Sequence, residues 1–326
     1  MSEICDIMFD IISEGCFMLN KKKVIMSLEI ILIIFVAIFV EDYIGLNLSY
    51  GMNKYEEVFL VQGNKDKYVP QGMTYSSKYN VVLQTSYSGK HEVSMLYVID
   101  FSSGELIKSL KLFDINGMED KSHVGGIATD NNIVWISSDY SVREYSLEDI
   151  IKCNEDYIRC RAVNNLGIRG DFCYYGYDTL YIGDFCYAPF YKVPDDNPLL
   201  LAYRAQNNYN YDIPDYIISL PKKVQGMTVL PNNNYAFTCS FTNLVQSDLK
   251  VYRNVLNEYP DEYYYKGTAI PYYKFSDTNS VMEAKLPPMA EGMFNINYDL
   301  YILFENSSDK YFYAFPKMKG VIKYKL

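Results

Sequence analysis

The side chains of this chain that could do chemistry gather just before a repeated glycine. Gln71, Gln225 and Glu291 each precede a glycine directly, and His123 lies two residues ahead of Gly125. Amide and carboxyl groups orient hydroxyl groups or bind metal ions, and a histidine can act as a base. These residues are therefore candidates for a ligand site, if the fold brings them together.

A second set of polar side chains follows the apolar run downstream of each glycine: Ser86, Asp139, Asp184, Ser240 and Glu305. Asp139 and Asp184, together with Glu291, offer the oxygen ligands that calcium prefers. The alternative interpretation is that these are solvated loop acids, because the chain has 40 acidic against 30 basic residues. His123 likewise has two interpretations, as a base or as a hydrogen-bonded structural residue.

The glycines mark an internal repeat. Gly72, Gly126, Gly226 and Gly292 open four copies of one pattern, and Phe172 stands in the glycine position of a fifth, degenerate copy. The markers are 54, 46, 54 and 66 residues apart. Each copy reads as short β-rich runs joined by Asn, Asp or Gly turns, and four strands make one blade. Periods near 50 residues predict a propeller.

The predicted fold class is therefore all-β, a β-propeller over residues 55–326. Five blades are the economical count. Six blades are the alternative, because Asn254 to Met282 is long enough for a degenerate blade and Tyr55 to Gln62 could complete a split one. No window after Tyr50 carries a convincing helical period.

The geometry of a propeller predicts where the polar residues of the repeat form a ligand site. The first strand of each blade lines the central channel and the second runs back, so the start of one and the end of the other lie on one face. We expect a small polar or sugar-like ligand there, because propeller mouths are concave and the face offers aromatic rings beside polar groups. The predicted ligand-binding residues are Gln71, Ser86, Tyr87, His123, Tyr140, Tyr187, Gln225, Ser240, Phe241 and Glu291. The glycines themselves have a purely structural alternative, close approach of crowded inner strands.

The N-terminal region predicts a membrane segment. Three lysines precede the apolar run 24–40, and Glu41 and Asp42 follow it, which indicates a cytoplasmic N-terminus. The run ends without the small residues of a cleavage site, so an uncleaved signal anchor is favoured over a signal peptide. We expect a cytoplasmic segment 1–23, a transmembrane helix 24–40, a linker 41–54 and a propeller outside the cytoplasm. The protein would thus be a single-pass protein of the cell membrane.

Five cysteines fall within the predicted propeller. Cys173 and Cys186 lie in two copies of Asp-Phe-Cys-Tyr around a turn, so a cross-hairpin disulfide is one interpretation. The other is that all are small buried hydrophobic residues. No spacing resembles a zinc site.

Composition excludes further classes. A net charge of −10 without a basic stripe argues against a nucleic-acid partner. Of the 34 tyrosines, most fall on predicted strands, where an aromatic ring suits a half-buried sheet face. The chain lacks a Gly-x-Ser-x-Gly elbow, a P-loop and a His-Glu-x-x-His motif.

The segment Pro287 to Met293, with its Glu291-Gly292 pair, resembles the calcium-dependent gluconolactonase and regucalcin-like propellers. The resemblance implies that Glu291 binds calcium at the start of an inner strand. The Asn and Asp ligands of that family have no assigned counterpart here, and Gln71 and Gln225 stand where further acids would be expected.

Three functions follow as hypotheses. The first is a membrane-anchored module that binds a small polar or sugar-like ligand at the channel mouth. The second is a calcium-dependent hydrolase of lactonase or esterase type, with Glu291 and Asp139 or Asp184 holding the metal. The third is a protein-interaction scaffold without a pocket.

Overall fold

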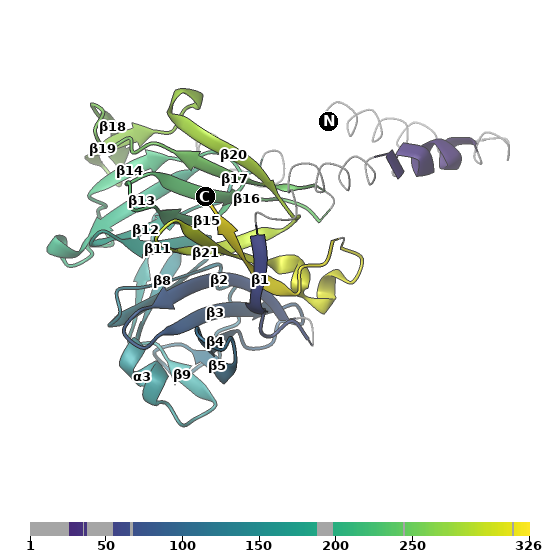
Figure 1. The fold of residues 1–326 in the computed structure, drawn as a ribbon. Coiled ribbons are helices and arrows are strands. Elements are labelled where there is room, and N and C mark those ends of the chain that lie inside the picture. The colour runs from purple at the N-terminus through teal and green to yellow at the C-terminus, as the bar shows by residue number, and fades with distance from the viewer. Residues whose placement is uncertain are drawn as a thin grey trace, which may run out of the picture. The chain divides into compact units, whose positions relative to one another are not determined.

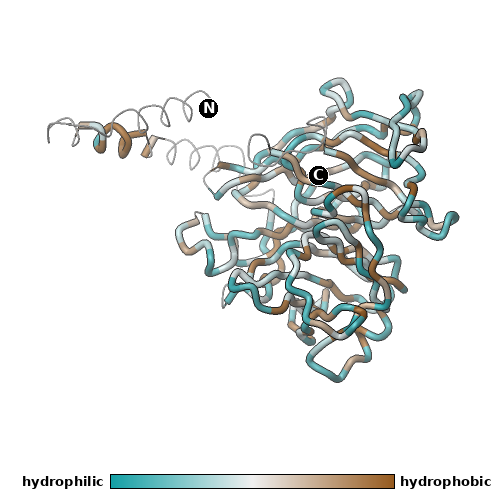
Figure 2. Tube along the Cα trace, turned by 180° about the vertical axis from the view of Figure 1, so that it is seen from behind, coloured by the Kyte–Doolittle hydropathy of each residue, from teal (hydrophilic) through white to brown (hydrophobic). Residues whose placement is uncertain are grey.

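The computed structural model describes residues 26–34, 36–37, 55–65, 68–187, 198–243, 245–314 and 316–326. The chain divides into two units, Met1–Leu48 and Ser49–Leu326. In the first unit, residues 26–34 and 36–37 are helical, and Figure 2 shows this helix as mainly hydrophobic. Within the described residues, no helix reaches the length and apolar character that crossing a membrane requires. The predicted anchor 24–40 extends beyond the described residues at both ends and stays a prediction.

Within the described residues, the second unit contains five four-stranded blades, two of them extended by added strands (Figure 1). Blade one is β2 (Tyr68–Ser76), β3 (Val81–Ser88), β4 (Met95–Asp100) and β5 (Leu106–Phe113). Blade two is β6 (Gly126–Thr129), β7 (Ile133–Ser138), β8 (Ser141–Ser146) and β10 (Ala162–Asn165). Blade three is β11 (Phe172–Gly176), β12 (Thr179–Gly183), β13 (Leu199–Arg204) and β14 (Tyr216–Ser219).

Blade four is β15 (Val224–Val229), β16 (Tyr235–Cys239), β17 (Ser247–Tyr252) and β20 (Ser280–Leu286). Blade five is β21 (Ala290–Ile296), β22 (Asp299–Phe304), β23 (Gly320–Lys325) and β1 (Tyr55–Leu60). The inner strands β2, β6, β11, β15 and β21 contact one another in a closed cycle. The five-bladed all-β propeller predicted from the repeat is therefore confirmed.

The repeated glycines lie where neighbouring inner strands approach most closely. A Cβ on Gly292 would lie 2.7 Å from the backbone oxygen of Gln71 and from the backbone nitrogen of Met73. A Cβ on Gly72 would lie 2.7 Å from the backbone nitrogen of Ile127. Real side chains do not fit at such distances, so the ring itself requires these glycines. The structural interpretation of the glycines is correct.

In blade three, a large residue replaces the glycine of the inner strand. Phe172 pairs with Gly183 across β11 and β12, and a Cβ on Gly183 would lie 2.1 Å from Cζ of the phenyl ring. The bulky residue on the first strand is thus accommodated by a glycine on the second.

Two insertions connect the outer edges of neighbouring blades. The hairpin of β18 (Asp261–Tyr265) and β19 (Thr268–Lys274) leaves blade four between β17 and β20, and β19 pairs in parallel with β14 of blade three (Figure 1). The single strand β9 (Tyr157–Arg159), on the connection between β8 and β10, pairs in parallel with β5 of blade one. The segment predicted to hide a sixth blade is therefore largely this hairpin and the strand β20.

The ring is closed by strands from opposite ends of the propeller's sequence. β1 pairs antiparallel with β23, with Tyr55 opposite Tyr324. Tyr55 to Gln62 thus completes blade five rather than a sixth blade.

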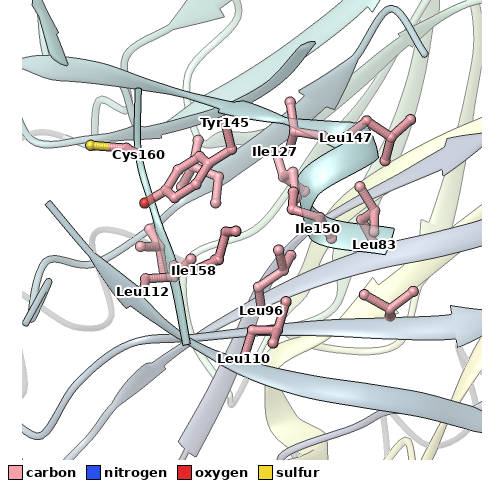
Figure 3. Close-up of a cluster of buried hydrophobic side chains, with 14 of the residues drawn as sticks. Leu83, Leu96, Leu110, Leu112, Ile127, Tyr145, Leu147, Ile150, Ile158 and Cys160 are labelled. Atoms are coloured by element: carbon pink, nitrogen blue, oxygen red, sulfur yellow. The ribbon is translucent and has the colours of Figure 1, made fainter. Parts of the chain in front are cut away.

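Apolar layers between blades form the core. Figure 3 shows one layer, in which Leu83, Leu96, Leu110 and Leu112 from blade one face residues of blade two and helix α3 (Leu147–Lys152). This short helix, capped by the Ser146 side chain, has no counterpart in the sequence-based expectation. Tyr145, Tyr203 and Tyr235 are fully buried, in agreement with a structural role for most tyrosines.

Candidate functional site

A cavity of about 440 Å³ lies at the face where the inner strands begin. Six of the predicted ligand-binding residues line it: Gln71, Tyr87, His123, Gln225, Phe241 and Glu291. They come from all the blades except blade three, which contributes Asp171 and Phe185 instead. The propeller geometry therefore does bring residues far apart in the sequence around one hollow, which we call the mouth cavity.

Two amide–carboxyl pairs link blades at the mouth cavity. Gln225 Nε2 of blade four donates a hydrogen bond of 3.0 Å to Glu291 Oε1 of blade five. Gln71 Nε2 of blade one donates a bond of 3.0 Å to Oε1 of Glu305, which follows β22. Tyr311 donates its hydroxyl to the same Glu305 oxygen at 3.1 Å. Blade five thus supplies both acids, and its two neighbours supply the amides that orient them.

The acids of the mouth cavity hold their protons more tightly than exposed acids. Burial raises the pKa of Glu291 well above its usual value, and the negative charges of Glu305 and Asp171 raise it further. Burial raises the pKa of Glu305 to about 7, against the lowering effects of Lys310, Tyr311 and Gln71. Carboxyl groups in this condition donate as well as accept hydrogen bonds. The mouth cavity is therefore less negative than its sequence indicates.

One wall of the cavity is built from stacked rings and a lysine. The rings of Tyr87 and His123 stack with their centroids 4.2 Å apart. Lys310 Nζ donates to the Tyr87 hydroxyl at 2.7 Å and lies over the rings of Tyr87 and Tyr311. The protein around His123 and the cations Arg169 and Lys310 lower its pKa. His123 is exposed at the surface, and its neutral imidazole extends the aromatic surface of Tyr87.

A second group of rings lies toward blades three and four. Phe241 packs against Tyr187, with ring centroids 3.8 Å apart, and stacks on Phe185 at 6.4 Å. Lys223 Nζ lies over the Tyr187 ring at 4.7 Å. Tyr187 supports the cavity wall through Phe241 and is not part of the lining itself.

Besides Tyr187, other predicted residues do not line the mouth cavity. Ser86 and Ser240 are buried: Ser86 faces Pro70 in the β2–β3 register, and the Ser240 backbone nitrogen donates to the Lys223 oxygen. Tyr140 is 60% exposed and lines a separate cavity of about 300 Å³. Asp184 borders that same cavity.

The three acids predicted as calcium ligands do not form one group. Asp184 Oδ1 accepts the backbone N–H of Leu199 at 2.6 Å, Asp139 is exposed, and Glu291 is held by Gln225. Among the described residues, no three His, Cys, Asp or Glu side chains lie together as metal ligands would. The residues therefore fit a calcium ion poorly, and calcium binding stays a prediction.

Sequence reasoning missed three charged or phenolic residues of the lining: Arg169, Lys310 and Tyr311. Arg169 pairs with Asp171 at 2.9 Å, two residues along the chain. Lys310 and Tyr311 lie in a 3-10 turn on the long connection between β22 and β23. A repeat pattern predicts only the positions that all blades have in common. These residues lie on connections that occur once in the chain. The signal available for Arg169 was its place two residues ahead of Asp171, which precedes Phe172 as Gln71 precedes Gly72.

Two residues beside the inner strands adopt a strained backbone. Val124 has a φ of 46° and Met289 a φ of 65°, in the left-handed region that β-branched and long side chains rarely occupy. Neighbouring hydroxyls hold Val124 in place, since its N–H donates to Ser138 Oγ and its oxygen accepts from Thr85 Oγ1. Backbone strain of this kind gathers at functional sites.

None of the five cysteines of the propeller is disulfide-bonded, namely Cys153, Cys160, Cys173, Cys186 and Cys239. The cross-hairpin disulfide considered for Cys173 and Cys186 is thus not formed. Cys173 and Cys186 are both buried, as the hydrophobic interpretation predicts.

No protein-family model and no curated protein matches the chain. Among solved structures, glutaminyl cyclase from Myxococcus xanthus matches 83% of this chain and 97% of its own, with a TM-score of 0.48 and 7% identity. The PQQ-bound aldose sugar dehydrogenase from Streptomyces coelicolor matches 83% of this chain and 96% of its own, with a TM-score of 0.47 and 12% identity. The propeller assignment rests on the closed ring of five sheets described above.

Proposed function

We propose that the propeller binds a small, polar, hydroxyl-rich ligand, such as a sugar, in the mouth cavity. The observation that carries the proposal is the convergence of two interblade pairs, Gln71–Glu305 and Gln225–Glu291, on one hollow of about 440 Å³. A hollow of this size suits a small molecule. Amide and carboxyl groups fixed from both sides are suited to orient several hydroxyl groups at once.

The hydrogen-bonding capacity of Gln225 supports this proposal. An amide NH₂ group has two hydrogens, and its carbonyl oxygen accepts two hydrogen bonds. Among the described residues, Gln225 spends one hydrogen on Glu291. The second hydrogen and the oxygen are left for a ligand. Gln71 spends both hydrogens, on Glu305 and on the Pro70 oxygen, so it would act through its oxygen.

The walls support a ligand with flat apolar faces between its polar groups. Sugar rings have this character, and they stack on aromatic side chains. Tyr87 with His123 forms one such platform, and Phe241 forms another. Arg169 is paired with Asp171, and the charge of Lys310 acts on Glu305, whose pKa it lowers, so the acids of the mouth cavity offset both cations and a neutral ligand is favoured.

The test is binding of a monosaccharide and polyol panel to the purified protein, measured by saturation-transfer NMR. We expect at least one compound to bind, and Gln225→Ala to weaken it about tenfold, which corresponds to about 1.4 kcal/mol. Asn116→Ala serves as the matched amide control, because this asparagine is exposed and lines neither the mouth cavity nor the cavity at the other end of blades three and four. A panel without any bound compound, or equal effects of the two variants, would contradict the proposal.

The same preparation separates the calcium-dependent hydrolase. Calcium bound by the folded state would raise the melting temperature, and Glu291→Gln would remove that rise. A calcium-dependent rise that this variant abolishes would replace the sugar-binding proposal by a metal-assisted one.

The sequence also supports a proposed single-pass membrane anchor at residues 24–40, with the propeller outside the cytoplasm. Lysines before the run and acids after it are typical of this orientation. Carbonate extraction of membranes tests the proposal. A protein that still contains residues 24–40 and resists extraction supports it, whereas release of the protein would contradict it.

A further inference from the structure

A second cavity, larger than the mouth cavity, lies at the other end of blades three and four. Its volume is about 520 Å³. Its lining includes the β11–β12 turn, residues after β13 and residues of the β15–β16 connection. These turns join a first strand to a second strand, or follow a third, so they lie at the end of the propeller opposite the mouth cavity. We call this hollow the phenol cavity.

Three tyrosines converge at the phenol cavity. Tyr181, Tyr216 and Tyr235 come from β12, β14 and β16 and are 3%, 4% and 2% exposed. The Tyr181 hydroxyl lies 2.8 Å from that of Tyr216 and 3.4 Å from that of Tyr235. Burial raises the pKa of Tyr216 and of Tyr235, so both remain neutral hydroxyl groups. Burying three phenol hydroxyl groups costs desolvation energy that apolar side chains at the same positions would not cost. Because these hydroxyl groups converge on a cavity, they provide a polar surface for a ligand.

One guanidinium group borders these phenols. Arg204 lies over the ring of Tyr216, with its Cζ 5.3 Å from the ring centroid. Within the described residues it takes part in no ion pair. The carboxyl group of Asp215, on the connection between β13 and β14, accepts instead from the backbone N–H of Arg204 and from the Asn207 amide. A planar cation held on a ring without a carboxylate partner is suited to bind a carboxylate of a ligand.

The rim of the phenol cavity adopts a strained hairpin turn. Tyr177 and Asp178 have φ angles of 52° and 54°, and they form the two-residue loop between Gly176 and Thr179. Such turns strongly prefer Asn-Gly, because both residues need a positive φ. Here the chain instead places a phenol ring that is 57% exposed. The Tyr177 hydroxyl donates to the Leu230 oxygen at 3.0 Å, which fixes the ring at the rim.

The geometry points to the phenol cavity as a binding site for a sugar acid, a hydroxyl-rich ring that carries one carboxylate. Arg204 binds the carboxylate, the phenols exchange hydrogen bonds with the hydroxyl groups, and the Tyr177 ring covers an apolar face. A phosphate is disfavoured, because Arg204 is the one basic residue in the described lining and Asp178 adds negative charge at the rim. This site is separate from the mouth cavity and does not depend on what binds there.

Three matched probes test the ligand class by isothermal titration against the full chain: sodium D-glucuronate, its neutral methyl ester and glucose 6-phosphate. We expect glucuronate to bind at least tenfold more tightly than the other two. Equal affinity for acid and ester, tighter binding of the phosphate, or no saturable binding of glucuronate would each overturn the inference.

Two variants locate the binding. Arg204→Met keeps the apolar stem over Tyr216 and removes the charge, so glucuronate should bind about tenfold more weakly while the ester is unaffected. Tyr177→Asn suits the turn and removes the ring, so both ligands should weaken while the melting temperature is held or raised. Gln225→Ala, at the mouth cavity, should leave glucuronate binding unchanged. Loss of binding in Gln225→Ala, with wild-type affinity in Arg204→Met, would assign the ligand to the mouth cavity and overturn the inference.

Discussion

Phe172 of β11 and Gly183 of β12 are register partners in blade three, and the phenyl ring fills the space that a side chain at position 183 would need. Blade three therefore keeps its four-stranded structure although Phe172 replaces the glycine of the repeat. In this hairpin the large side chain is on β11 and the glycine is on β12. In the neighbouring blade two, the pair is Gly126 and Ser137, with the glycine on the inner strand.

This exchange predicts coupled substitutions. Gly183→Ala should destabilise the protein by about 1–3 kcal/mol, because the added methyl group overlaps the Phe172 ring. Phe172→Leu alone should also cost stability, since it leaves a gap. The double variant should be more stable than the sum of the two losses predicts, because the smaller leucine makes room for the methyl group. Urea unfolding of the four proteins measures the coupling, and strict additivity would contradict the explanation.

The inner ring predicts a different outcome at Gly292. In Gly292→Ala, the new methyl group would meet backbone atoms of Gln71 and Met73 at 2.7 Å, and backbone cannot move aside without opening the ring. We expect a loss of about 3 kcal/mol or a failure to fold.

Gly170→Ala is the matched control for Gly292→Ala. Its methyl group would meet Cβ of Ser137 and the side-chain ends of Leu166 and Ile182 at 3.0 to 3.4 Å, which requires smaller shifts than the backbone contacts of 2.7 Å at Gly292. Thermal unfolding should therefore show a clearly smaller loss than at Gly292. Equal losses would mean that close approach of inner strands does not explain the repeated glycines.

Glu305 predicts a pH dependence of stability. Its pKa is about 7 in the folded protein, above the usual 4.3 of an exposed glutamate. The folded state therefore binds the proton more tightly, and this contribution to stability is lost as pH rises from about 4 through 7. Glu305→Gln removes the titration and should gain stability over the wild type at pH 8, on the order of 1–2 kcal/mol relative to pH 5.

Urea unfolding at both pH values checks this difference. Glu262→Gln, on the exposed edge of β18, controls for the loss of a charge. A Glu305→Gln variant whose stability follows the wild type in parallel at both pH values would show that Glu305 does not titrate in this range.

The cysteines predict site-specific labelling. Burial raises the pKa of Cys173 and of Cys239 to about 12, and thiols react as thiolates. Iodoacetamide at pH 8 should label Cys153, which is only partly buried, and should leave the other four propeller cysteines unmodified in the native protein. All five should react in urea without reductant. A Cys173–Cys186 peptide pair that needs reductant before it reacts would contradict the absence of a disulfide bond.

The repeat made the blades and the mouth cavity predictable, because each copy forms the same strands in the same order. Close approach of the inner strands requires the glycine in four of the five copies, and the residue before it falls at the same place in each blade, so the positions of Gln71, Gln225 and Glu291 could be predicted from the sequence. Residues outside the repeated part follow no such rule. Lys310 comes from a connection of blade five that has no equivalent elsewhere, and Tyr140 is turned toward a different hollow.

The inserted strands were unpredictable for a related reason. β9 and β19 pair in parallel with strands of the preceding blade. Such pairing requires an outermost strand with unpaired backbone groups in the neighbouring blade. The sequence of the inserted strand itself does not indicate which blade offers one. The consecutive tyrosines of the β18–β19 hairpin indicate strands, but they do not identify the sheet that these strands join.

The pairing of β1 with β23 sets the order in which the chain can mature. β1 is the first strand of the propeller to leave the ribosome and β23 is the last, so the first strand has to wait for nearly the whole domain to be synthesised. Until then, both edges of the incomplete blade five present unpaired backbone groups. The nascent chain therefore passes through a stage in which two open edges can join two different molecules, and its yield should depend on how dilute that stage is kept.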